Sequence, residues 1–124
     1  MPVKLKNYVH GLWTEGSDGG AAIYHAVNGE HIFNATTKGI DFKSLLDYGR
    51  KTGGQKLRKM TFHERARMLK ALALYLNEKK KDFYALSAAT GATKGDSWID
   101  IDGGIGNLFV YASKGRRELP DESF

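Results

Sequence analysis

The sequence predicts a mixed α/β protein in which a β-hairpin region, about residues 7–36, precedes three or four helices over about residues 41–115. Two patterns lead to this fold class. Large and polar side chains alternate early in the chain, as in a strand with one buried face. After Asp41, apolar residues recur at steps of three and four, as in amphipathic helices. A length of 124 residues suits one domain, or part of one.

The β region is expected to contain an early strand and a hairpin. Residues 8–13 alternate large and polar side chains and predict one strand. Residues 22–27 and 30–35 flank Asn28-Gly29, the dipeptide most typical of a tight hairpin. We expect a type I′ turn there, because Asn and Gly best tolerate the positive φ that both of its central positions need.

The first helix is expected to begin after Asp41, whose carboxylate can accept hydrogen bonds from free backbone amides of the first turn. It carries Phe42, Leu45 and Leu46 as apolar positions. Residues 52–54, Thr-Gly-Gly, should break it, because glycine is a poor helix former.

Thr61 and Glu64 form the sequence pattern of a capping box, in which each side chain bonds the other residue's backbone amide. A buried stripe follows at helical spacing and comprises Phe62, Ala66, Leu69, Leu72, Ala73 and Leu76. We expect a separate, shorter helix over residues 82–90, ended by Gly91 in the left-handed conformation.

The last predicted helix contains three glycines, Gly103, Gly104 and Gly106. Asp96 or Ser97 can cap it. One face carries Trp98, Ile101, Ile105, Leu108, Phe109 and Ala112. Each glycine costs about 1 kcal/mol relative to alanine inside a helix. We therefore expect another helix or a ligand to approach the backbone there.

The net positive charge is compatible with nucleic acid as a partner, but the distribution of the basic residues argues against it. Nineteen Lys and Arg against fourteen Asp and Glu give a net charge of +5. The basic residues are dispersed and mostly have acids near them, so we expect solvated helix ends. A stand-alone basic module that binds RNA or a protein partner remains the alternative function. No apolar run is long enough for a membrane span, and the absence of Cys fits a reducing, cytoplasmic compartment.

Motifs for catalysis, phosphate binding and metal binding are incomplete. Residues 49–56 have the glycine spacing of a P-loop, but Gln55 occupies the lysine position. Residues 104–109 begin like a dinucleotide fingerprint, but Phe109 replaces the third glycine. The four histidines are too scattered for a metal site: His10, His25, His31 and His63. We assign no catalytic, cofactor-binding or metal residue from these patterns.

Three segments carry a resemblance to known enzymes. Residues 57–71 and 83–93 resemble the N-terminal helices of the aldehyde dehydrogenase superfamily. Residues 96–121, with Asp-Ser-Trp-Ile-Asp-Ile-Asp-Gly-Gly at their start, are similar to a narrower family. That family comprises the bifunctional ring-opening enzymes of phenylacetate degradation, in which oxepin-CoA hydrolase is fused to a semialdehyde dehydrogenase. Ala89 and residues 92–94 depart from the superfamily, whose acidic residue and Gly-Lys-Pro they do not reproduce.

The resemblance implies that residues 1–124 are the N-terminal portion of an aldehyde dehydrogenase domain, and hence an incomplete domain. It implies a cytoplasmic, homo-oligomeric parent that oxidises a CoA-thioester semialdehyde to the acid with NADP. The catalytic cysteine and glutamate, the cofactor motif and the hydratase domain would lie further along, so none is carried over. The chain alone is expected to be inactive and to bind no NADP.

The resemblance also places one wall of the substrate tunnel on the last helix. Ile99, Gly103 and Asn107 follow one another by one turn, so they lie on neighbouring positions of one face. Gly103 is expected to widen the tunnel for a large CoA thioester, with Asn107 near its polar mouth. Close packing of another helix against the glycines is the alternative explanation.

Overall fold

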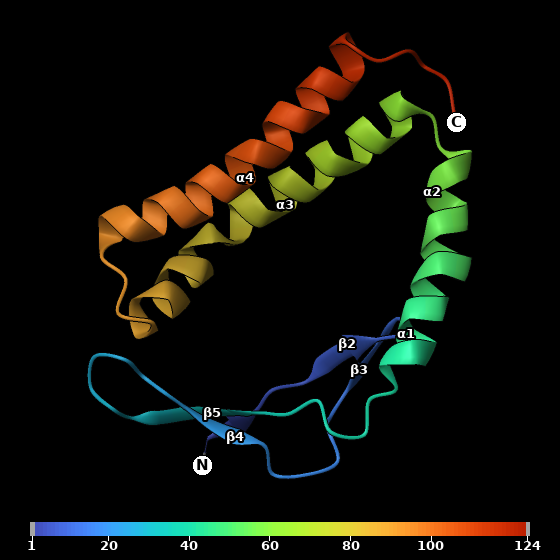
Figure 1. The fold of residues 1–124 in the computed structure, drawn as a ribbon. Coiled ribbons are helices and arrows are strands. Elements are labelled where there is room, and N and C mark those ends of the chain that lie inside the picture. The colour runs from blue at the N-terminus through green and yellow to red at the C-terminus, as the bar shows by residue number, and fades with distance from the viewer. Residues whose placement is uncertain (1, 124) are drawn as a thin grey trace. The chain divides into compact units, whose positions relative to one another are not determined.

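The computed structural model describes residues 2–123 and confirms the mixed α/β class (Figure 1). The chain divides between Gly54 and Gln55 into two compact units. Its length alone had predicted one domain or part of one. The first unit holds all the strands and α1, whereas the second holds the two long helices, α3 and α4.

A three-stranded sheet forms the centre of the first unit, in the order β1-β5-β4. Its strands are β1 (Val3–Lys4), β4 (Ala21–Tyr24) and β5 (His31–Ala35). The first strand begins earlier than the expected β region and pairs with β5 in parallel. Apolar side chains in this unit stay largely accessible, and residues 2–54 contain no fully buried hydrophobic side chain.

The hairpin of β4 and β5 is confirmed, but the predicted type I′ turn at Asn28-Gly29 is wrong. Gly29 has φ 73°, whereas Asn28 does not have positive φ. The Gly29 amide instead donates to the His25 carbonyl at 2.9 Å, and the His25 amide donates to the Glu30 carbonyl at 2.8 Å. The connection is therefore a longer turn, in which only its last residue needs the left-handed conformation.

The single strand predicted for residues 8–13 is also wrong. The segment folds back as two antiparallel strands, β2 (Asn7–Val9) and β3 (Leu12–Thr14), with Val9 opposite Leu12. His10 and Gly11 connect them with φ of 52° and 83°. These two residues have the positive φ that both central positions of a type I′ turn require. The alternation of large and polar side chains could not predict this turn, because alternation does not indicate where a strand reverses direction.

The first helix, α1 (Phe42–Tyr48), begins where it was predicted to begin. The Asp41 carboxylate accepts hydrogen bonds from the amides of Lys43 and Ser44 at 3.0 and 3.1 Å. The predicted break at residues 52–54 is wrong, because the chain continues as a π-helical turn, η1 (Gly49–Gly54), and then as α2 (Gln55–Lys59). Two glycines lower helix stability without preventing a helical conformation.

The capping box of Thr61 and Glu64 is confirmed at the start of α3 (Phe62–Ala89). The prediction of two helices is wrong, because α3 runs unbroken for 28 residues. Lys79, Lys80 and Lys81, which precede the expected second helix, are good helix formers. Residues 62–90 contain neither Gly nor Pro. Gly91 follows the helix with φ 85°, the left-handed conformation predicted for it.

The last helix, α4 (Lys94–Arg117), begins earlier than predicted. Thr93 caps it. Asp96 occupies the third helical position, where its carboxylate accepts a hydrogen bond from the Thr93 amide at 3.0 Å. Ser97 is buried and its hydroxyl bonds the Thr93 carbonyl and the Ser87 hydroxyl. Asp96 and Ser97 therefore support this terminus from inside the helix rather than capping it.

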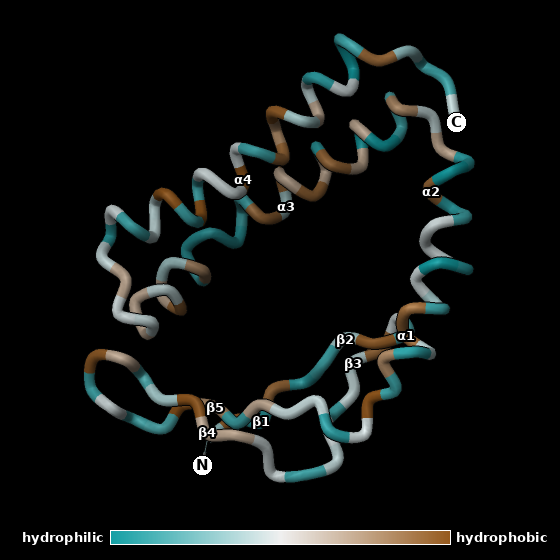
Figure 2. The backbone as a smooth tube through the Cα atoms, in the orientation of Figure 1, coloured by the Kyte–Doolittle hydropathy of each residue, from teal (hydrophilic) through white to brown (hydrophobic). Residues whose placement is uncertain are grey.

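Helices α3 and α4 lie side by side as a helical hairpin, which contains the buried hydrophobic residues found within residues 2–123 (Figures 1 and 2). These residues are Ala66, Ala73, Ile105 and Ala112. The predicted stripe is confirmed in part: Ala66 and Ala73 are buried, but Leu72 is 45% exposed. Small residues at this seam let the two backbones approach closely, while much larger side chains remain outside it.

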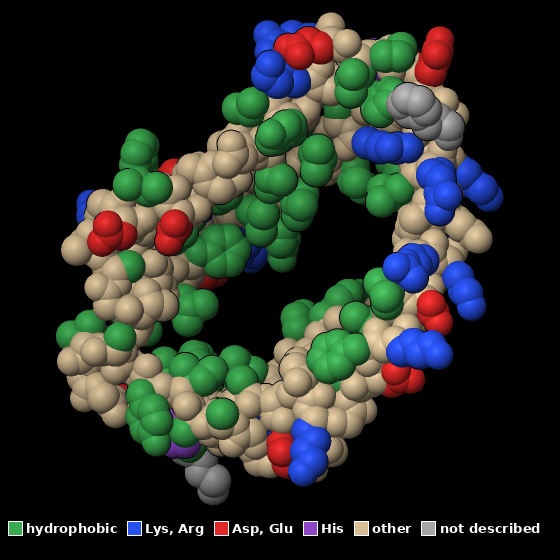
Figure 3. Space-filling model, viewed as in Figure 1, with side chains coloured by type: hydrophobic (Ala, Val, Ile, Leu, Met, Phe, Trp, Pro, Cys, Tyr) green, Lys and Arg blue, Asp and Glu red, His purple; other side chains and the backbone are tan. Residues whose placement is uncertain are grey.

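Hydrophobic side chains also gather over the accessible surface of the helical hairpin (Figure 3). They include Met68, Leu72, Tyr75, Leu86, Trp98, Ile99, Val110 and Tyr111, each at least 44% exposed. A surface this apolar is typical of a face that contacts other protein or a ligand. The two helices thus bury one narrow seam and leave a second apolar surface accessible.

Candidate functional site

The three predicted tunnel-wall residues, Ile99, Gly103 and Asn107, are all exposed on α4. Ile99 is 64% exposed, and apart from the neighbouring residues and backbone of its own helix turn, no atom lies within 4 Å of the position that a Cβ would take at Gly103. Since Ile105 and Ala112 mark the side of α4 that is buried, the helical spacing puts Gly103 on the opposite side. The structure therefore brings these residues onto one accessible face.

Three glycines of α4, Gly103, Gly104 and Gly106, do not meet a second helix among the described residues. At Gly104 and Gly106, as at Gly103, a Cβ would have no atom within 4 Å other than those of its own helix turn. Close packing among the described residues therefore does not explain these three glycines. The close approach in the hairpin occurs instead at Gly115, where a Cβ would lie 3.2 Å from the Cβ of Ala66.

A polar cluster joins the middle of α4 to α3. The Lys80 ammonium donates to Asp102 Oδ1 at 2.6 Å, and the Tyr84 hydroxyl donates to Asp102 Oδ2. The hydrogen bond from Lys80, and then that from Tyr84, lower the pKa of Asp102 below its ordinary value. The same contact raises the pKa of Tyr84, because the phenol loses a hydrogen bond to the carboxylate when it ionises.

Motifs and periodicity do not predict this cluster. Asp100 and Asp102 are two residues apart, so helical geometry predicts side chains that face different directions, one of them toward solvent or a cap. Asp100 is indeed exposed, whereas Asp102 reaches partners 18 and 22 residues away. The cluster links α3 to α4. In its ion pair, the Lys80 side chain is 38% exposed and the Asp102 side chain is 23% exposed. Its geometry suits a structural link rather than an acid–base pair.

Asp102→Asn is expected to reduce the loss of stability that the protein shows in acid. The pKa of Asp102 is lower in the folded chain than in the unfolded chain, where it should be about 3.9. Its stabilising effect is therefore complete above that value and is lost as the pH falls through the folded pKa. Urea unfolding measured between about pH 6 and pH 2 should show a shallower decline for the variant.

Asp100→Asn serves as the control for this experiment, because Asp100 is an exposed carboxylate of the same helix turn. Equal pH profiles for Asp102→Asn and the unmodified protein would contradict the role given to the cluster. Asp96 also has a lowered pKa through its bonds to Thr93, so some acid sensitivity should persist in both variants.

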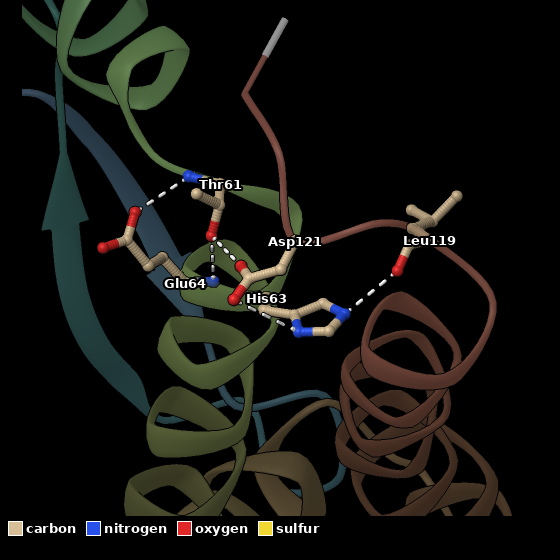
Figure 4. A network of polar contacts seen from close by, with 5 residues as sticks. All are labelled: Thr61, His63, Glu64, Leu119 and Asp121. Carbon is tan, nitrogen blue, oxygen red and sulfur yellow. Dashed lines mark hydrogen bonds and ion pairs between the residues drawn. The ribbon is translucent and has the colours of Figure 1, made fainter.

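A second polar network fastens the segment after α4 to the start of α3 (Figure 4). The Thr61 hydroxyl donates to Asp121 Oδ1 at 2.6 Å, while Glu64 accepts from the Thr61 amide at 2.8 Å. His63 bonds the Leu119 carbonyl through Nε2 at 2.9 Å and lies 3.7 Å from Asp121 through Nδ1. The helix cap thus also holds a segment that is distant in sequence.

Thr61→Ala is expected to lower the free energy of unfolding by about 0.5–2 kcal/mol, because it removes the hydroxyl that bonds the Glu64 amide. Asp121→Ala provides the matched control, since it removes the contacts of Asp121 with Thr61 and His63 but leaves the hydrogen bond of the cap in place. Chemical denaturation of both variants should show a larger loss for Thr61→Ala. Equal losses would mean that the cap itself contributes little.

The histidines and the incomplete motifs lie in separate places. His10 contacts Ser44 at 3.3 Å, and His31 contacts Asn34 at 2.7 Å. Within residues 2–123, no group of three His, Asp or Glu side chains is placed to hold a metal ion.

Residues 104–109 are part of the regular helix α4, so they do not form the strand-to-helix turn of a dinucleotide site. No helix in the described part of the chain is sufficiently long and apolar to cross a membrane.

Comparison with known proteins gives one strong similarity, and no family model matches the chain. The similarity is to an aldehyde dehydrogenase-like protein. That relative is the 3,4-dehydroadipyl-CoA semialdehyde dehydrogenase of Aromatoleum evansii, which is 39% identical over 115 residues. The alignment covers 92% of this chain but 22% of the relative, so the chain spans about a fifth of the relative's length.

Proposed function

We propose that this chain forms the N-terminal part of a CoA-linked semialdehyde dehydrogenase that takes part in the degradation of aromatic compounds. The identity of 39% over nearly the whole chain carries the proposal, because the relative's name gives the same reaction class. The accessible apolar surface of the helical hairpin supports it, since such a surface suits contact with further protein or substrate.

The reaction proposed for the whole enzyme is oxidation of the semialdehyde to the acid, through a thiohemiacetal on a cysteine. The 124 residues contain no cysteine, so this part of the enzyme would not carry the nucleophile. NADP is the proposed cofactor of the whole enzyme. Residues 104–109 of this chain do not fit the glycine-rich turn that would hold its pyrophosphate, because they are helical and end in Phe109.

The part of the reaction that this chain would serve is substrate positioning. Ile99, Gly103 and Asn107 are proposed as one wall of the tunnel through which the CoA-linked semialdehyde enters. The exposure of all three and the empty space beside Gly103 support this placement. A helix that retains glycine where no described side chain contacts it sacrifices about 1 kcal/mol of stability, and space for a bulky substrate accounts for that.

The test compares two purified proteins on the CoA-linked semialdehyde and NADP. A polypeptide that extends this chain to the relative's length is expected to form NADPH, whereas residues 1–124 are expected to form none. Absorbance of NADPH at equal protein concentrations measures both. Failure of the extended polypeptide would contradict the proposed function, and activity of residues 1–124 would contradict the assignment of catalysis to another part.

A finer proposal concerns the rest of the parent enzyme. We propose that it is a cytoplasmic homo-oligomer and that a fused domain hydrolyses oxepin-CoA to supply the semialdehyde. The resemblance of residues 96–121 to the bifunctional family supports this step. Consumption of oxepin-CoA by the extended polypeptide is the expected result, and dehydrogenase activity without it would restrict the function to semialdehyde oxidation.

A further inference from the structure

The helical hairpin has a basic cavity on a side that the proposed tunnel wall does not use. A cavity of about 290 Å³ is lined by Lys70 of α3 and by four residues of α4: Phe109, Ala112, Ser113 and Arg116. A second cavity of about 270 Å³ shares Ser113 and Arg116 with the first and adds Arg117. We refer to these two neighbouring cavities together as the basic cavity.

The cations of the basic cavity lack carboxylate partners. Lys70, Arg116 and Arg117 form no ion pair with any carboxylate of residues 2–123. No Asp or Glu lines either cavity among those residues. The nearest acid in sequence, Glu118, pairs with Lys114 at 3.2 Å. The lining of the basic cavity therefore contains three exposed cations, from two helices, that have no carboxylate partner among the described residues.

Compensation of the helix dipole explains only part of this arrangement. Arg116 and Arg117 belong to the last turn of α4, where cations are favourable. Lys70 lies within α3, away from both of its ends, and has no such reason to be basic. The cavity also has an apolar part, formed by Phe109 and the buried Ala112. Cations beside an aromatic ring fit an anion that is attached to a flat, partly apolar group.

We propose that the basic cavity binds the phosphate group of a nucleotide. Arg116 would donate two hydrogen bonds to phosphate oxygens, Lys70 would supply a second charge, and the Ser113 hydroxyl a further donor. Phe109 would contact the base. Two molecules of the proposed dehydrogenase carry such a phosphate on a ribose: CoA has a 3′-phosphate and NADP has a 2′-phosphate. Both are candidates only because of the proposed function, on which this step of the inference rests.

The proposal is tested by calorimetric titration of the 124-residue chain with four probes. These probes are adenosine 3′,5′-bisphosphate, adenosine 2′,5′-bisphosphate, inorganic phosphate and a single-stranded RNA of ten nucleotides. We expect at least one bisphosphate to bind more tightly than inorganic phosphate, and the affinity to fall as salt increases. Preference for the 3′,5′ compound identifies CoA as the source, and preference for the 2′,5′ compound identifies NADP.

Variants separate the basic cavity from general positive charge. Arg116→Ala and Lys70→Ala should each weaken bisphosphate binding about tenfold or more, because each loses a charge-assisted hydrogen bond. Lys79→Ala removes an exposed lysine of α3 outside the cavity and should leave the affinity unchanged. Arg116→Lys keeps the charge and should lose less than Arg116→Ala. Matching circular dichroism spectra establish that the variants fold alike.

Three results would overturn the proposal: equal affinities for bisphosphate and inorganic phosphate, equal losses in Lys79→Ala and Arg116→Ala, or binding of the RNA alone. The result is independent of the dehydrogenase assay on the extended polypeptide. An active dehydrogenase whose N-terminal part fails to bind either bisphosphate would disprove the basic cavity alone. Tight bisphosphate binding in an inactive extended polypeptide would disprove the proposed function alone.

Discussion

Gly115→Leu is expected to lower the free energy of unfolding of the 124-residue chain by about 1–2 kcal/mol. A Cβ at this position would lie only 3.2 Å from the Cβ of Ala66, which is buried, and the rest of a leucine side chain needs more room. The two helices must then separate or shift. Leucine is the better helix former by about 0.8 kcal/mol, which offsets part of the strain.

Gly106→Leu is the matched control, because it makes the same replacement in the same helix where no atom lies within 4 Å. It should raise the free energy of unfolding by about 0.8 kcal/mol through helix propensity alone. Urea denaturation followed by circular dichroism measures both variants. A stabilised Gly115→Leu would show that the contact with Ala66 relaxes without strain, and that the seam is looser than the distance indicates.

Gly103→Leu in the extended polypeptide is expected to lower kcat/KM for the CoA-linked semialdehyde about tenfold or more. The value for a small free aldehyde should change much less. The reason is steric: a leucine would project from the proposed tunnel wall between Ile99 and Asn107, where the larger substrate needs space. In residues 1–124 alone the same change should increase stability, because nothing described lies near Gly103.

Two outcomes separate the tunnel from packing against other parts of the enzyme. A selective loss on the CoA-linked substrate, with an unchanged melting temperature, supports the tunnel wall. Equal loss on both substrates together with a lower melting temperature would mean that Gly103 contacts another helix of the whole enzyme.

Local chemistry made the helix starts predictable when a side chain and its partner amide are only two or three residues apart. Asp41 and Thr61 cap α1 and α3 as expected, and Gly91 has the left-handed conformation after α3. The same reasoning misplaced the start of α4, because Asp96 and Ser97 are residue types that cap helices well, whereas the residue that caps α4 is Thr93. Several adequate local choices compete there, and the sequence does not rank them.

By itself, the sequence determined the fold class, the β4–β5 hairpin and the amphipathic character of α3. Only the tertiary structure decided which apolar residues are buried, because α4 covers Ala66 and Ala73 but leaves Leu72 accessible. It also joined Lys80 to Asp102 and placed Lys70 beside Arg116 in the basic cavity. Helical periodicity defines a face but not what covers it. Charges far apart in sequence meet only when two helices choose a register, and small residues such as Gly115 and Ala66 allow that register.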